Sequence, residues 1–363
     1  MAQILPSMPT ISVIIPAYNS AATIIAALES IRLQTVQPDE VIVVNDASTD
    51  GTVQVVERYL REQIQDGSES AVGDQVASSP AGRVSCPPLK VSSAGWFSTV
   101  RLLQMQKNGG PAAARNRGMA EARSEWIAFL DADDVWLPDK IERQSRILSV
   151  TGGAVLVCGA TVPLETEGLV TGRTETAAES GSLGVQSDAV ALSLSQFRVC
   201  NPVATSTVLV NKKAAACLGG FDEQFRGPED YDLWMRLAAK GTLIRMPDRL
   251  ACYREVADGL SLNHRKFLPQ VLRVVDKAYG PGGALHGGPG RRQARAYQFL
   301  AAAWSAAAQH EIALAYGLYL RSLLQWPGRF SLATHLGGAR RRLAVSIARS
   351  TVECWVRQPT RRR

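Results

Sequence analysis

Two units of strand, loop and helix follow one another in the first sixty residues. Residues 11–18 form a short apolar run, and a segment of helical composition follows to about residue 33. A second apolar run at 41–44 ends in the polar loop 45–52, after which helical composition resumes to about residue 61. This alternation predicts an α/β fold with a parallel sheet and helices on both of its faces. In such sheets ligands bind at the carboxyl ends of the strands.

Acidic residues lie where two of these strands are expected to end. Asp46 follows the second apolar run, and the run Asp131-Ala132-Asp133-Asp134 follows the apolar stretch 126–130. Clustered carboxylates repel one another unless a cation is present. Hard oxygen ligands suit Mg²⁺ or Mn²⁺, whose open positions are commonly completed by substrate phosphates. The run therefore indicates a metal-diphosphate site, although an acidic stretch before Pro138 is also a good loop and helix cap.

A glycine pair lies between the two acidic loops. Gly109 and Gly110 precede Pro111, a residue suited to the first turn of a helix, and the helix carries Arg115 and Arg117. Its positive end and a guanidinium can meet a nucleotide or its phosphates. The alternative is a tight turn followed by solvated arginines.

Five segments in this chain form a recognisable series: VIIPAYN at 13–19, VNDASTDGT at 44–52, NGGPAAARNRG at 108–118, FLDADD at 129–134 and GPEDYDLWMRL at 227–237. In these segments and their order the chain resembles the inverting glycosyltransferases of family 2, whose nucleotide-diphospho-sugar-binding domain has the GT-A fold. The resemblance covers residues 10–256, about two thirds of the chain.

The resemblance implies a role for each matching position. The nucleotide-sugar-binding residues that it implies are Pro16, Ala17, Tyr18, Asp46, Gly110, Arg115, Asp131, Ala132 and Arg254. Among these, Asp46 would accept a hydrogen bond from uracil or ribose. Asp133 would bind the Mn²⁺ or Mg²⁺ ion directly, with Asp131 holding the ribose or the water shell of the metal. Asp50 has an alternative role as the cap of the helix that begins near residue 52.

An acidic pair supplies the candidates for a general base. In the family, such a pair before the Leu-Trp helix removes the proton of the attacking acceptor hydroxyl. We assign this role to Asp230 and keep Glu229 as the alternative, because the sequence does not say which side chain points inward. The alternative is structural. Glu229, Asp230 and Asp232 would then form the negatively charged first turn of a helix, which the helix dipole favours.

The match to the family is imperfect at two places. Ala47 stands where the family often has Gly, a change that matters only if the backbone there has a positive φ. Many relatives carry a basic residue or His in a short loop before a Ser, whereas this chain has residues 255–261 after Arg254, and His264 comes later. We therefore expect His264 to be a surface or packing residue.

Composition predicts two domains. A catalytic domain is expected at 10–262, with an insertion at about 63–98 that is rich in Ser, Gly, Pro and Ala, and a second loop of similar composition at 161–188. The second loop is either an acceptor-side loop or an inert surface loop. A helical, Arg-rich region is expected at 263–363. With the fold that the resemblance implies, the expected fold class is a GT-A (Rossmann-like), mostly parallel sheet with a C-terminal α-helical extension.

Two helices are expected within 293–324 and a third within 343–356. Apolar residues recur there at helical spacing: Tyr297, Leu300, Trp304, Ala313, Tyr316, Leu320 and Leu323. Packing as a helical hairpin is the preferred interpretation of this stripe, and membrane contact is the second.

Charge is concentrated at the carboxyl end of the chain. Residues 281–363 contain thirteen Arg and two Glu, a net charge of +11, whereas the whole chain carries +7, so residues 1–280 carry −4. Without interleaved aromatic residues or a nucleic-acid module, no nucleic acid is expected as a partner. An anionic membrane surface is one expected partner of this region, and a solvated basic face is the alternative.

The expected compartment follows from what the sequence lacks. The start of the chain lacks the pattern of a signal peptide, and no apolar run reaches the length of a spanning helix. The six cysteines have no metal-ligand spacing, so free thiols are expected. The sequence therefore predicts a cytoplasmic protein, peripheral at the inner face of the membrane if the Arg-rich region binds lipid.

The expected activity is inverting, metal-dependent transfer of one sugar. The donor would be a nucleoside-diphosphate sugar, with UDP preferred, and the acceptor a hydroxyl of a saccharide or lipid-linked molecule, in making a surface polysaccharide or glycolipid. A nucleotidyltransferase is the competing enzyme class, but residues 16–19 are not the Gly-rich basic loop that it would need after the first strand. A catalytically silent nucleotide-sugar-binding or scaffold protein is the alternative outside enzymes.

Overall fold

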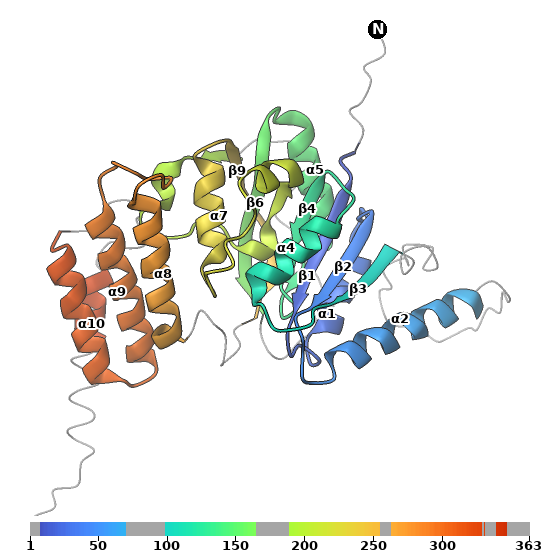
Figure 1. The fold of residues 1–363 in the computed structure, drawn as a ribbon, viewed down its shortest axis with the longest axis horizontal. Coiled ribbons are helices and arrows are strands. Elements are labelled where there is room, and N and C mark those ends of the chain that lie inside the picture. The colour runs from blue at the N-terminus through green and yellow to red at the C-terminus, as the bar shows by residue number, and fades with distance from the viewer. Residues whose placement is uncertain are drawn as a thin grey trace, which may run out of the picture.

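The computed structural model describes residues 8–69, 99–164, 189–254, 263–328, 330 and 339–346. Its centre is one mixed sheet in which nine strands of the described residues take part, eight of them in the order β3-β2-β1-β4-β8-β6-β9-β5, with β7 paired to β9. The mixed α/β class that the sequence predicts is confirmed, and helices cover both faces of the sheet (Figure 1).

The N-terminal half of the sheet is parallel. It consists of β1 (Ile11–Ala17), β2 (Glu40–Asn45), β3 (Val100–Gln104) and β4 (Trp126–Phe129), with β1 at the centre between β2 and β4. These four strands are therefore parallel, as the alternation of strand and helix in the sequence predicts. The carboxyl ends of β1, β2 and β4 consequently meet at one edge.

The second half of the sheet mixes the two directions, which the sequence patterns did not reveal. It contains β5 (Val135–Trp136), β6 (Ala154–Pro163), β7 (Val190–Leu192), β8 (Leu209–Asn211) and β9 (Thr242–Tyr253). Strand β8 is antiparallel to both β4 and β6, whereas β6 and β9 are parallel. Strands β5 and β7 each pair with β9 in the antiparallel direction.

Alternating side chains of β1 divide the core between the two faces. Val13 and Ile15 pack with α1 (Ile24–Arg32), α2 (Thr52–Glu69) and α5 (Lys140–Val150). Ile14 packs on the opposite face, in a cluster that includes residues of five helices. These are α4 (Pro111–Glu121), α6 (Lys212–Cys217), α7 (Glu229–Ala238), α8 (His264–Tyr279) and α9 (Arg291–Ala308). Two short 3₁₀ turns, η3 (Leu194–Arg198) and η4 (Thr205–Thr207), lead into β8.

Two expected boundaries are wrong. The second helix was expected to end near residue 61 and the insertion to begin near 63, but α2 continues to Glu69 because residues 62–66 contain neither Gly nor Pro to end it. The second loop was expected from residue 161, but β6 continues to Pro163 by pairing with β9. The rest of the insertion, residues 70–98, and of the second loop, residues 165–188, lie outside the described residues.

The C-terminal region contains the expected helical hairpin. Helices α9 (Arg291–Ala308) and α10 (Ile312–Gln325) pack against each other, and Ser322 Oγ donates a hydrogen bond to the carbonyl of Ala296 at 2.7 Å. With α8 they form a group at the side of the sheet (Figure 1). Residues 339–346 are helical, and the rest of the third expected helix lies outside the described residues.

The buried face of the hairpin differs from the apolar stripe that the sequence suggested. Ala315, Leu318 and Ser322 are the buried residues of α10, whereas Tyr316 and Leu320 are 54% and 39% exposed. Helix α9 buries Phe299 and Leu300 together with several Ala residues, so small and large apolar side chains share the contact. Within the described residues, no helix combines the length and the apolar character that crossing a membrane requires.

The division of the chain at 262/263 stays a prediction. Val271, Val274 and Ala278 of α8, beyond that boundary, share one apolar cluster with Trp234 and Phe129 of the catalytic region. Four cysteines of the described residues, Cys158, Cys200, Cys217 and Cys252, are free thiols.

Helix α4 packs on β1 through a glycine, and this contact gives a first prediction. A Cβ on Gly118 would lie 2.5 Å from Cγ2 of the fully buried Ile14. We therefore expect Gly118→Ala to lower the free energy of unfolding by about 1–3 kcal/mol, the usual effect of overpacking, although Ala is the better helix former. Urea denaturation measures this change.

The control is Gly317→Ala in α10, where a Cβ would meet nothing within 4 Å. That substitution should stabilise the protein by about 0.5–1 kcal/mol. Equal gains in stability from both substitutions would show that α4 does not depend on the close approach to β1.

Candidate functional site

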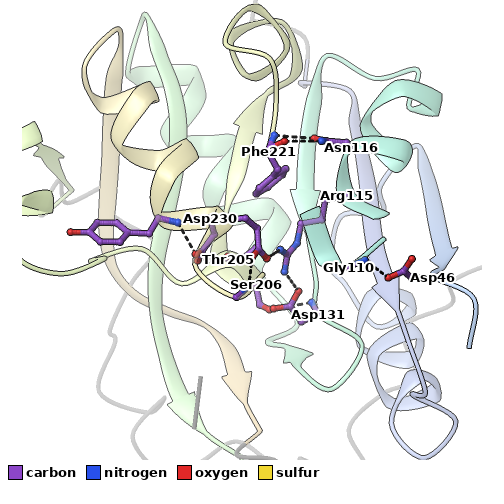
Figure 2. A network of polar contacts seen from close by, with 12 residues as sticks. Asp46, Gly110, Arg115, Asn116, Asp131, Thr205, Ser206, Phe221 and Asp230 are labelled. Carbon is purple, nitrogen blue, oxygen red and sulfur yellow. Dashed lines mark hydrogen bonds and ion pairs between the residues drawn. The ribbon is translucent and has the colours of Figure 1, made fainter. Parts of the chain in front are cut away.

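Asp46 and Asp131 both lie at the carboxyl edge of the parallel strands, as predicted. Asp46 directly follows β2, and Asp131 follows β4 after Leu130. The two strands flank β1, so their loops face each other across its end (Figure 2). The site is therefore built where two different α/β units meet.

Asp46 holds the glycine loop in place. Its Oδ1 accepts a hydrogen bond from the N–H of Gly109 and its Oδ2 one from the N–H of Gly110, both at 2.7 Å. Asp46 is 3% exposed, and Gly110 has φ = 85°, a conformation that favours glycine. The carboxylate thus fixes the entry to α4, and its predicted hydrogen bond to uracil or ribose stays a prediction.

The loops after β1 and β2 are tied to each other. Asn19 Oδ1 accepts a hydrogen bond from the N–H of Thr49 at 2.8 Å, and both oxygens of Asp50 accept backbone hydrogen bonds, from Thr52 and from Ala21. Asp50 therefore caps α2, the alternative role that the sequence left open. Ala47 has φ = 56°, so the change from the Gly of many relatives does place a side chain in a left-handed conformation.

The residues expected to border the nucleotide base follow β1 into this loop. Ala17 is buried at the end of the strand, Pro16 is half-buried, and Tyr18 is 49% exposed. An exposed aromatic ring beside the strand ends is available for stacking on a planar ligand.

Arg115 joins the two acidic segments of the site. Its Nη2 donates to Oδ1 of Asp131 at 2.6 Å, and its Nη1 donates to Oε1 of Glu229 at 2.7 Å (Figure 2). The side chain of Arg115 is 6% exposed and that of Glu229 is 2% exposed. Glu229 Oε2 accepts a further hydrogen bond from the N–H of Gly227 at 2.6 Å. Both oxygens of Glu229 are thus engaged within the protein.

Asp131, Asp133 and Asp134 form a cluster of like charges. Burial, and then the charge of Asp131, raise the pKa of Asp133 above the usual value for an aspartate. The same two causes raise the pKa of Asp134, whose carboxylate accepts hydrogen bonds from Ser206 Oγ at 2.5 Å and from the N–H of Arg254 at 3.1 Å. Negative charge is therefore only partly compensated here, and a cation would relieve the repulsion.

The chemistry of this cluster fits a divalent metal. Its donors are carboxylate oxygens, which Mg²⁺ and Mn²⁺ prefer, and Asp131 is still 34% exposed at the side chain. Nowhere in the described ranges do three or more His, Cys, Asp or Glu side chains form a group that could hold an ion by themselves. An ion at Asp133 would therefore need oxygen atoms from a bound diphosphate or from water.

Asp230 differs from its neighbour Glu229 in environment. Asp230 is half-buried, and its Oδ2 accepts hydrogen bonds from Asn201 Nδ2 at 3.0 Å and from Thr205 Oγ1 at 2.9 Å. Burial, and then the charge of Glu229, raise the pKa of Asp230 to about 7. A carboxylate with such a pKa can take up a proton near neutral pH.

Arg254 and His264 lie in different parts of the structure. Arg254 packs against the acidic run and donates from Nε to the carbonyl of Asp133 at 3.0 Å. His264 begins α8, is 5% exposed and lies 3.0 Å from Glu311 Oε2 through Nε2. His264 is thus a packing residue between α8 and α10, as the sequence suggested.

Several polar residues of the site were missed by the sequence analysis. Asn201 and Thr205 contact Asp230, and Ser206 links Asp134 to the N–H of Asp131 at 3.2 Å. They lie on a short irregular segment between η3 and β8 that has no periodic pattern. Arg226 lies beside the glycine loop, since its Nε is 3.6 Å from the place that a Cβ of Gly110 would take. Its position just before the GPED segment is the one signal in the sequence that could have identified it.

The sequence matches two profiles of one enzyme family. The profile described as Glycosyltransferase like family 2 matches residues 98–279, half of the chain, and the profile described as Glycosyl transferase family 2 matches residues 12–67. Together they include every segment of the site. The chain therefore belongs to glycosyltransferase family 2, a family of transferases, and its fold is GT-A.

Relatives and solved structures agree with this assignment. The putative teichuronic acid biosynthesis glycosyltransferase TuaG of Bacillus subtilis is 26% identical over 275 residues, 75% of this chain and 90% of TuaG. The Escherichia coli UDP-Glc:alpha-D-GlcNAc-diphosphoundecaprenol beta-1,3-glucosyltransferase WfaP is 26% identical over 271 residues, 74% of this chain and 86% of WfaP. ExoO of Rhizobium meliloti, a succinoglycan biosynthesis protein, is 31% identical over 150 residues, which span 41% of this chain and only 33% of ExoO.

The fold has a solved counterpart in the mannosyltransferase PcManGT from Pyrobaculum calidifontis, in complex with GDP-Man and Mn²⁺. The TM-score is 0.54 at 19% sequence identity, and the alignment covers 97% of this chain and 89% of that structure. At this identity the likeness concerns the fold.

The bridge made by Arg115 gives a second prediction. Replacing Arg115 by Met leaves the buried Glu229 without its charge partner, so the free energy of unfolding should fall by about 3–5 kcal/mol. Urea denaturation of the purified protein measures the loss. Adding Glu229→Gln to Arg115→Met should restore part of it, because the uncompensated charge is then removed.

The matched control is Arg117→Met on the same helix. Arg117 is 55% exposed and pairs with Glu121 on the surface of the same helix, so the expected change is within about 0.5 kcal/mol. If Arg115→Met were no more destabilising than Arg117→Met, the bridge would not be what connects α4 to α7.

Proposed function

We propose that this chain transfers one sugar from a nucleoside-diphosphate sugar to a hydroxyl group of an acceptor, with inversion at the anomeric carbon. The observation that carries this proposal is that Arg115 binds carboxylates from both acidic segments of the site. One of its nitrogen atoms holds Asp131 of the donor-side acidic run, and another holds Glu229, the residue next to the candidate base Asp230. Donor and base are thereby kept at a fixed separation.

The donor is expected at the carboxyl edge of β1, β2 and β4. Tyr18 is exposed there for contact with the base of the nucleotide, and the loop that Asp46 holds brings the positive end of α4 to the same edge. UDP is the preferred nucleotide, a choice supported by the UDP-Glc named for the relative WfaP.

Asp230 is the residue that we assign as the general base. Glu229 uses one oxygen for Arg115 and the other for Gly227, whereas Asp230 is half-buried and has a raised pKa. In the proposed reaction, the acceptor oxygen forms a bond to the anomeric carbon while the bond from that carbon to the β-phosphate oxygen breaks. The hydroxyl proton passes to a carboxylate oxygen of Asp230, and the nucleoside diphosphate leaves.

Asp133, assisted by Asp131, would hold a Mn²⁺ or Mg²⁺ ion against the diphosphate. When bound, such an ion supplies charge neutralisation for the leaving diphosphate. Arg254, whose Nε and N–H both contact the acidic run, keeps that run in position. The metal in the mannosyltransferase complex of the same fold is compatible with this assignment.

The acceptor is expected to be a saccharide or a lipid-linked saccharide, in making a surface polysaccharide or glycolipid. The names of TuaG and WfaP, which refer to teichuronic acid and to a diphosphoundecaprenol acceptor, support this choice. A nucleotidyltransferase is disfavoured by the family. A silent nucleotide-sugar-binding protein would not need a general base, whereas this chain has a half-buried carboxylate with a raised pKa beside the donor site.

Two substitutions test the assignment of donor and base together. Asp133→Ala should abolish metal-dependent binding of UDP-sugar, because it removes the direct ligand. Asp230→Asn should bind UDP-sugar as the unaltered protein does but lose transfer by about 10²–10⁴-fold, the usual contribution of a general base. Thermal stability with UDP, GDP and dTDP sugars, each with and without Mn²⁺, measures binding, and release of the nucleoside diphosphate measures transfer.

The pH profile provides a further readout of the same test. Only the ionised carboxylate of Asp230 accepts a proton, so kcat should rise with pH through about 7 and level off above it. If Asp230→Asn transferred sugar at the full rate, the general base would have to be assigned to Glu229 or to another residue. If the protein is folded and no donor shifts its thermal stability, the alternative of a catalytically silent protein is favoured.

A peripheral membrane contact through α10 is a second proposal, supported by one observation. Tyr316, Leu320 and Leu324 recur every four residues and are 54%, 39% and 77% exposed. Arg321 is exposed beside them, and Arg292 Nη2 lies 3.3 Å from the carbonyl of Leu324. An exposed apolar stripe with arginines at its edge suits an anionic bilayer surface.

Vesicle sedimentation tests this contact. Replacing Tyr316, Leu320 and Leu324 together by Ser should weaken binding to vesicles containing phosphatidylglycerol by about 10-fold, since apolar area no longer enters the interface. The control is Val150→Ser on α5, a side chain that is 60% exposed on a different helix. Equal binding by the triple variant and the control would contradict the proposal.

A further inference from the structure

A cavity of about 300 Å³ lies next to the base, because one of its lining residues, Asn201, is hydrogen-bonded to Asp230. It is lined by residues 159–161 of β6, by the segment 201–204 before η4 and by Arg245 of β9. Its volume is at the lower end of that of small-molecule sites, enough for about one sugar unit. The register between β6 and β9 shifts on both sides of Ala160, which opens the sheet surface at this point.

Asn201 connects this cavity to the reaction. It lines the cavity, and its Nδ2 donates to Oδ2 of Asp230 while its Oδ1 accepts from the N–H of Val203 at 3.1 Å. Both polar atoms of its side chain are thus used to hold the base and the wall of the cavity together. A molecule bound in the cavity would therefore be next to the carboxylate that removes the proton.

Arg245 gives the cavity a positive charge that no carboxylate of the described residues neutralises. It lies on β9 between two neighbouring strands, opposite Cys158 of β6 and Val190 of β7, and is half-buried. Across the described residues no carboxylate lies within 4.0 Å of its guanidinium. An arginine in the interior of a sheet is costly without a partner, so an anion is its expected complement.

The geometry points to this cavity as an acceptor subsite that binds an anionic group of the acceptor through Arg245 and presents a neighbouring hydroxyl to Asp230. This inference rests on the proposed function and adds the class of acceptor, a saccharide that carries a phosphate or a carboxylate. Two sources have this chemistry: a saccharide linked through a diphosphate to a lipid, and a saccharide that contains a uronic acid. Arg can bind either group through two parallel hydrogen bonds.

Direct binding of three matched probes to the full chain tests the inference. The probes are octyl glucoside, octyl glucuronide and glucose linked through a diphosphate to an octyl chain, each titrated by calorimetry with UDP and Mn²⁺ present in excess to fill the donor site. At least one of the two anionic probes should bind about 10- to 100-fold more tightly than octyl glucoside, as expected for a charge-assisted hydrogen bond. The stronger of the two identifies the source of the anion.

Variants on one strand locate the effect. Arg245→Gln should remove the preference for the anionic probe, Arg245→Lys should keep part of it, and Arg249→Gln should keep it in full. Arg249 is exposed on the same strand but does not line the cavity. An anionic preference that survives Arg245→Gln, or its absence from the unaltered protein, would overturn the inference.

Binding of UDP, measured separately for each variant, distinguishes this inference from the proposed function. Arg245→Gln should bind UDP as the unaltered protein does, which also shows that it is folded. Failure of every form to bind UDP would count against the glycosyltransferase proposal, whereas the preference between charged and neutral probes can be read with or without UDP.

Discussion

The buried guanidinium of Arg115 is the contact on which the geometry of the site depends. It lies on α4, yet its two hydrogen bonds reach Asp131 after β4 and Glu229 at the start of α7. Its carbon Cζ also lies 5.5 Å from the centre of the Phe221 ring, which packs on Phe129 and Trp234. Burying one positive and two negative groups is costly unless all are paired. The acidic run and the base-bearing helix are therefore kept in one relative position.

This arrangement explains why local sequence patterns predict the parts of the site but not their connections. The alternation of strands and helices correctly placed Asp46 and Asp131 at one edge, because that rule depends only on the order of elements. Arg115 and Glu229 are separated by 114 positions in the sequence, and no local pattern relates them. Arg115 was assigned to the donor from its helix and from the family resemblance, whereas its Nη1 and Nη2 atoms are hydrogen-bonded to protein carboxylates.

The choice between Glu229 and Asp230 shows the same limit. Both residues are acidic, adjacent and in the first turn of α7, so their positions in the helix do not distinguish them. Only tertiary contacts separate them, since Glu229 meets Arg115 while Asp230 meets Asn201 and Thr205. The antiparallel strands and the buried face of α10 were missed for a related reason. Strands of two or three residues carry little periodicity, and the apolar residues of α10 lie on more than one side of the helix, so their partners decide which of them are buried.

Charge is separated across the site, and this separation bears on how donor and acceptor can bind at the same time. The donor side carries Asp131, Asp133 and Asp134, and burial, followed by the charge of Asp131, already raises the pKa of Asp133 and of Asp134. A diphosphate can approach these acids only together with a cation. An anionic acceptor would meet the same repulsion unless its charge were held elsewhere. Arg245, in the cavity that is also lined by Asn201, the hydrogen-bond partner of Asp230, offers that place without competing for the cation, so each charged substrate would have its own counter-charge.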